Sequence, residues 1–116
     1  MKLRLSREEF DELVERAFAQ LPRRFRDKLP NVAIEVEDSP PPAMREGDPL
    51  MGIFQGVPMT EKSVFQSSGP DRVVLYQKNI ESACRTRKEL QREIRLTLLH
   101  ELGHFFGLSE EELEDI

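Results

Sequence analysis

The two histidines of this 116-residue chain, His100 and His104, lie four residues apart in a stretch with helical periodicity. Four residues advance an α-helix by about 40°, so both imidazoles leave the same face and can bind one metal ion. Neutral imidazoles suit zinc, which in catalytic sites keeps one position for water. Glu101 projects about 100° around the helix from His100, where it can accept a proton from that water. The spacing therefore predicts His100 and His104 as zinc ligands and Glu101 as a general base.

A glycine and an acid follow the second histidine, which extends the motif to H-E-x-x-H-x-x-G-x-x-E and ends it at Glu110. Gly107 can adopt the left-handed conformation that ends a helix and turns the chain back towards the metal. A carboxylate oxygen is a suitable zinc donor, so Glu110 is the expected third ligand. Glu111 and Glu114 stay open as alternatives, because they belong to the same acidic segment.

This motif resembles the metzincin signature, H-E-x-x-H-x-x-G-x-x-H, with glutamate in place of the third histidine. The residues after Glu110 are too few for the methionine-containing turn of the metzincins, so their full fold is not expected. The chain is instead similar to the minimal zincin-like family of small bacterial metallopeptidases. That resemblance covers the first helix, residues 56–58, residues 71–76 and the metal motif.

The resemblance implies a zinc-dependent metallopeptidase that hydrolyses bonds in a peptide or protein substrate. In zincins an extended substrate lies along an edge strand above the motif helix, and residues 72–76 are the candidate strand. The alternative is a non-catalytic, metal-stabilised module for peptide binding or regulation, since a chain this small has few walls for a cleft. Cys84 is not expected to be a nucleophile, because both histidines belong to the metal motif. We expect Tyr76 to pack rather than stabilise an oxyanion.

Helix signals flank the centre of the chain. Residues 6–9 have the capping-box form Ser-x-x-Glu, and apolar residues then recur at intervals of three and four up to Leu21. Residues 86–89 form a second capping box, which begins a long helix that carries the metal motif and ends near Gly107. A third such pattern at residues 109–112 predicts a short final helix.

Three segments between the helices have strand character. Residues 32–36 alternate between apolar and polar, and residues 72–76 form the most β-prone run. Residues 50–58 are a weaker candidate, because their glycines indicate a bulge or a close backbone contact. A short helix is expected over residues 79–84. The order predicts one α+β domain over residues 1–116, a minimal zincin-like fold with helices on one face of a small, mostly three-stranded sheet.

Charge and apolar content exclude several classes of protein. Lys and Arg total 17 against 22 Asp and Glu, a net charge of −5 that disfavours a nucleic-acid partner. No apolar run approaches the roughly 18 residues that a membrane span requires, and the first residues lack a secretory signal. Cys84 is the single cysteine, which is typical of a reducing compartment. A cytoplasmic protein without a membrane partner is therefore predicted.

Overall fold

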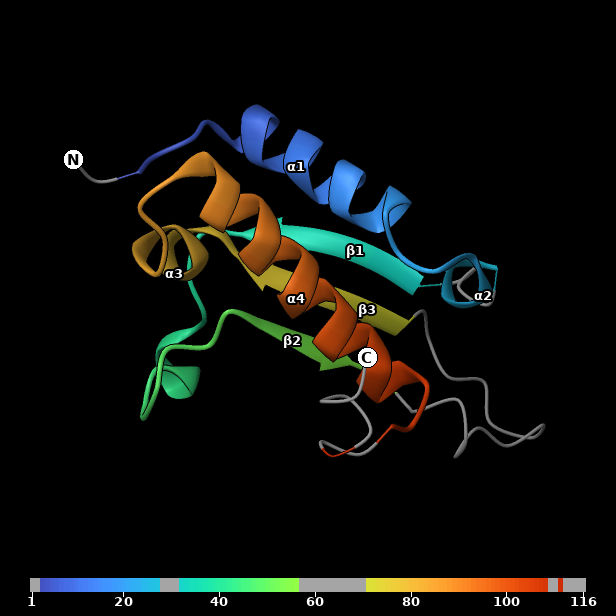
Figure 1. Ribbon diagram of the computed structural model, residues 1–116. Coiled ribbons are helices and arrows are strands. Elements are labelled where there is room, and N and C mark those ends of the chain that lie inside the picture. The colour runs from blue at the N-terminus through green and yellow to red at the C-terminus, as the bar shows by residue number, and fades with distance from the viewer. Residues whose placement is uncertain (1–2, 28–31, 57–70, 109–110, 112–116) are drawn as a thin grey trace.

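A mixed sheet forms the centre of the computed structural model, which describes residues 3–27, 32–56, 71–108 and 111 (Figure 1). The strand order is β1-β3-β2. The central strand β3 (Asp71–Tyr76) pairs in parallel with β1 (Val32–Glu37) and antiparallel with β2 (Gly52–Gln55). The predicted α+β class is confirmed. The prediction that residues 72–76 form an edge strand is wrong, because β3 has a partner on each side.

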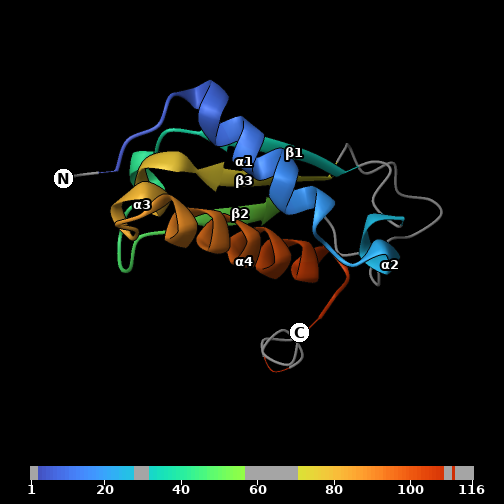
Figure 2. The same ribbon diagram turned by 45° about the horizontal axis from the view of Figure 1, so that its top comes forward.

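Helices α1 (Arg7–Ala19) and α4 (Arg87–Phe105) pack side by side on one face of this sheet (Figures 1 and 2). The capping box that begins α1 is complete: the Glu9 amide donates to the Ser6 hydroxyl at 3.1 Å, and the Ser6 amide donates to the Glu9 carboxylate at 3.3 Å. At the start of α4 the Glu89 amide donates to the Thr86 hydroxyl at 3.1 Å. Both predicted helix starts are therefore confirmed, but the predicted capping box at residues 86–89 is incomplete, because the Glu89 carboxylate accepts from the Arg85 amide at 2.8 Å instead of the Thr86 amide.

Shorter helices lie at the two ends of the sheet. Helix α3 (Gln77–Ser82) follows β3 directly and begins two residues before the predicted short helix. Helix α2 (Arg23–Arg26) lies at the opposite end (Figure 1). A 3-10 turn, η1 (Pro42–Met44), interrupts the connection from β1 to β2. None of the helices in the described ranges is long and apolar enough to cross a membrane.

The main core lies between the sheet and the two long helices. Apolar residues that recur at helical spacing on α1 and α4 meet alternate residues of β3 there. The fully buried members of this core are Phe10, Ala17, Val73, Leu75, Ile80, Leu90, Ile94, Leu98 and Leu102. The two strand residues on that list are two apart, as a pleated strand with one face on the core requires. This packing fixes α4 over the sheet.

The end of α4 is defined by a pair of backbone hydrogen bonds. The Leu108 amide donates to the Gly103 carbonyl at 3.0 Å, and the Gly107 amide donates to the His104 carbonyl at 3.0 Å. This is the Schellman arrangement, which needs a left-handed residue, and Gly107 supplies it with φ +75°. The predicted helix end is confirmed. The short final helix predicted at residues 109–112 lies outside the described residues, apart from Glu111.

Candidate metal centre

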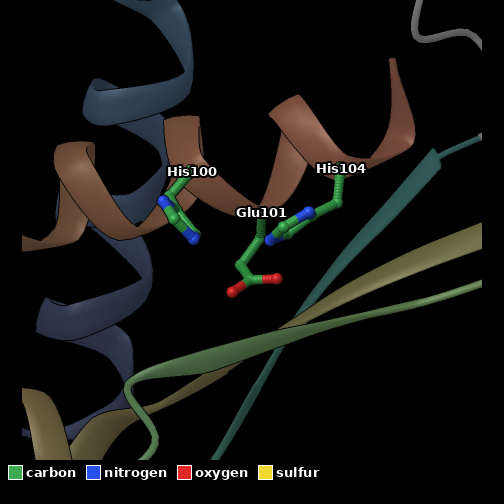
Figure 3. Close-up of side chains that lie close together, drawn as sticks. All are labelled: His100, Glu101 and His104. Carbon is green, nitrogen blue, oxygen red and sulfur yellow. The ribbon is translucent and has the colours of Figure 1, made fainter. Parts of the chain in front are cut away.

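His100, Glu101 and His104 lie on the last turns of α4, and their side chains extend from the helix towards β2 (Figure 3). All three side chains are half-buried, neither enclosed in the core nor fully in solvent. Local sequence explains the position: the apolar stripe of α4 faces the core, which turns the flank that carries the motif towards the neighbouring strand. The group is therefore held by a helix, a more rigid support than a loop.

The three side chains lie close enough to share one cation. One ligand atom from each of His100, Glu101 and His104 lies within 4.8 Å of the others. The two imidazole rings meet edge to face, with centroids 4.9 Å apart and planes inclined at 85°. The structure thus brings together the residues that the i, i+4 spacing predicted would meet.

The donor set fits zinc. Zinc prefers imidazole nitrogen and carboxylate oxygen in tetrahedral geometry, and with Zn–N bonds of about 2.0–2.1 Å two imidazole donors on one ion lie about 3.4 Å apart. The ligand atoms of His100, Glu101 and His104 all lie within 4.8 Å of one another, so rotation about the side-chain bonds is enough to bring both imidazoles onto one ion. The two imidazole nitrogens of His100 and His104 match the ligand types of catalytic zinc sites better than the all-oxygen sets of magnesium or calcium, and the Glu101 carboxylate lies beside them as the base for a bound water.

The other predicted site residues fall in different places. Glu110 and Glu114 lie outside the described residues. Glu111 is exposed, and in the described part of the chain the acidic and histidine side chains that can share an ion are those of His100, Glu101 and His104. The assignment of Glu110 as the third ligand therefore rests on the sequence motif.

Aromatic side chains hold the helix end that follows His104. Phe105 is buried and meets Phe54 of β2 at a ring distance of 6.0 Å. Phe106 contacts Phe105 at 5.2 Å and Phe25 of α2 at 5.1 Å. Such tilted and edge-to-face pairs stabilise beyond the area they bury. They tie the end of α4 to both β2 and α2.

Strand β2 approaches α4 closely at Gly52. A β-carbon on Gly52 would stand 3.0 Å from the Thr97 Cγ2 atom of α4 and 2.9 Å from the Val74 carbonyl oxygen of β3, so only glycine fits there without displacement. This is the close contact that the glycines of residues 50–58 predict. The sequence did not show that β2, rather than β3, is the sheet edge beside the metal motif.

Tyr76 and Cys84 do not belong to the metal group. Tyr76 is buried at the end of β3 that leads into α3, and burial raises the pKa of its phenol. Burial also raises the pKa of the Cys84 thiol, with nearby Glu93 and Glu89 adding to the effect. A buried thiol that keeps its proton is a poor nucleophile, which agrees with the exclusion of a cysteine mechanism.

Comparison with known proteins adds a family and a related fold. The sequence model described as zincin-like metallopeptidase matches residues 29–116. A solved structure, the conserved hypothetical protein TTHA0227 from Thermus thermophilus, superposes with a TM-score of 0.60 and 29% sequence identity. The match covers 88% of this chain and 94% of that chain. No functionally curated protein shows significant sequence similarity to the chain.

Proposed function

The chain belongs to the zincin-like metallopeptidase family, and from this premise we propose that it hydrolyses peptide bonds of peptide or protein substrates at the group formed by His100, Glu101 and His104. One observation carries the proposal: these three side chains converge within 4.8 Å on one flank of α4. Family membership suggests metal-dependent hydrolysis, and the convergence of these side chains supports this group as its site.

Each residue has a proposed role. His100 and His104 hold zinc through their imidazole nitrogens, and Glu110 completes the protein ligands. Zinc held by these residues would supply a Lewis acid that activates a bound water and polarises the scissile carbonyl. Glu101 accepts the proton of the attacking water and returns it to the leaving amine, because its carboxylate adjoins both imidazoles.

The substrate backbone is proposed to lie along β2. This strand stands at the end of the described strand order, beside α4, and its Gly52 allows helix and strand to approach closely. An extended peptide can add to such an edge through main-chain hydrogen bonds, which favour no particular sequence. The proposed strand replaces residues 72–76, which form the centre of the sheet.

The Glu101→Gln substitution tests the proposal. The variant should keep its zinc content and lose about 10²- to 10⁴-fold in cleavage of a mixed peptide library, the usual contribution of a general base. Glu93→Gln is the matched control: it removes the same charge two turns earlier on the same helix and should leave cleavage unchanged. If the unmodified protein binds zinc but cleaves no peptide at any pH, the non-catalytic binding module is the better account.

A further inference from the structure

A cavity of about 790 Å³ opens at the end of the molecule where α3 leads into α4. It is far from the metal centre, because the start of α4 and His104 are separated by about 25 Å of helix at 1.5 Å per residue. Its volume lies within the range of about 300–1,000 Å³ that is typical of small-molecule sites. Apolar surface comes from Leu3, Leu5 and Cys84, and the remaining lining is polar or charged.

The inner wall of this cavity is a closed hydrogen-bond network. Gln77 and Glu81 are only 5% and 8% exposed. The Leu5 amide donates to the Glu81 carboxylate at 2.7 Å, and the Gln77 side-chain amide donates to the Leu5 carbonyl at 2.9 Å. The chain between Leu3 and Ser6 is thereby held against α3. A wall of this kind is preformed and loses little entropy when a ligand binds.

Both carboxylates that line the cavity are already engaged. Glu81 accepts the hydrogen bond from Leu5. Asp38 forms an ion pair with Arg7 at 2.5 Å, and the same guanidinium donates to the Val36 carbonyl at 2.7 Å. Neither acid is therefore available to neutralise the other cations of the lining.

Three cationic side chains at the cavity, those of Arg4, Lys78 and Arg85, are exposed and have no such partner. Their side chains form no hydrogen bond or ion pair with any residue in the described ranges. With Arg7, the lining holds four cations against two carboxylates, in a chain whose net charge is −5. Positive charge is thus concentrated at one preformed cavity.

We propose that this cavity is a second ligand site, which binds a small organic anion. Its carboxylate or phosphate group lies among Arg4, Lys78 and Arg85, where charge-assisted hydrogen bonds are available, and its apolar part contacts Leu3 and Leu5. The site is independent of the peptidase proposal, because it shares no residue with the metal centre.

An NMR titration at constant ionic strength tests the site. Inorganic phosphate and butyrate are the two probes, and amide signals of residues around the cavity, such as Leu5, Ser82 and Arg85, are the readout. Saturable shifts with phosphate identify a phosphate ligand, and saturable shifts with butyrate identify a carboxylate. Linear shifts with both probes would overturn the proposal.

A pair of double variants separates the cavity from general surface charge. Lys78→Gln with Arg85→Gln should weaken binding about tenfold or more, since each substitution removes a charge-assisted hydrogen bond to the anion. Neither side chain forms a hydrogen bond or ion pair with a residue that the structure describes, so the fold should persist with an unchanged thermal transition. Arg92→Gln with Arg95→Gln removes equal charge from the exposed face of α4 and should leave affinity unchanged. Equal losses in both variants would sink the proposal, whereas Glu101→Gln should not affect it.

Discussion

Gly52 of β2 and Thr97 of α4 approach so closely that a β-carbon on Gly52 would stand 3.0 Å from the Thr97 Cγ2 atom. Thr97 is one turn before Glu101 on the same helix. The contact therefore sets the separation between the metal motif and the strand along which we place the substrate. Glycine weakens a strand, but Gly52 allows β2 to lie close to α4 because it has no side chain.

Substitution of Gly52 by alanine should lower the free energy of unfolding by about 1–3 kcal/mol, the usual effect of overpacking. The added methyl meets backbone as well as side chain, so the helix or the strand must move. Urea unfolding measures the loss. Thr97→Ser in the alanine background removes one of the clashing atoms and should recover part of it. A Gly52→Ala protein of unchanged stability would contradict the close approach.

The third ligand can be identified by single alanine substitutions in the acidic tail. Glu110→Ala should weaken zinc binding at least about tenfold, because it removes one of the protein donors. Glu111→Ala is the control of equal charge, since Glu111 is exposed and stands outside the metal group. Competition with a chelator gives the affinities. If Glu114→Ala has the large effect and Glu110→Ala has none, the assignment moves to Glu114.

Gly107→Ala should cost about 1 kcal/mol of stability, because residue 107 has φ +75° and a β-carbon disfavours that conformation. Gly107→Asn should cost less, since asparagine tolerates left-handed geometry better. Chemical denaturation ranks the three proteins. Zinc affinity should follow the same order if the turn after His104 directs Glu110 to the metal. Equal stability of all three would show that the turn does not depend on glycine.

Alkaline pH should destabilise the fold through Cys84 and Tyr76. Burial raises the pKa of both groups, so the folded state holds their protons more tightly than the unfolded chain does. Their contribution to stability is therefore full below about pH 8.5 and declines as the pH rises further. Urea unfolding at neutral and alkaline pH measures the decline. Cys84→Ser combined with Tyr76→Phe should reduce it, and an equal decline in that variant would contradict the assignment.

Local features of this fold were predictable from sequence. The capping box at Ser6 and the N-cap at Thr86 depend on residues within one turn, and the convergence of His100 with His104 depends on helical spacing alone. Such features can be predicted because the interactions that form them involve residues only a few positions apart in the sequence. The helix end at Gly107 belongs to the same class, because a single backbone conformation decides it.

Non-local features were not predictable in the same way. Residues 72–76 are strongly β-prone, but propensity does not tell whether a strand lies at the edge or the centre of a sheet. Pairing partners separated by many residues decide that, and here β1 and β2 both pair with β3. The approach of β2 to α4 has the same origin, because a glycine indicates a close contact but not which element makes it.

The position of β3 also constrains how the protein can be made. It is the last of the described strands to leave the ribosome, yet it is the one to which both others bond. Until Tyr76 has been synthesised, β1 and β2 lack the central strand with which they pair. Helix α4, which covers one face of the sheet, is synthesised later still. Folding is therefore deferred until most of the polypeptide has been synthesised, and nascent chains arrested before β3 should require chaperone protection.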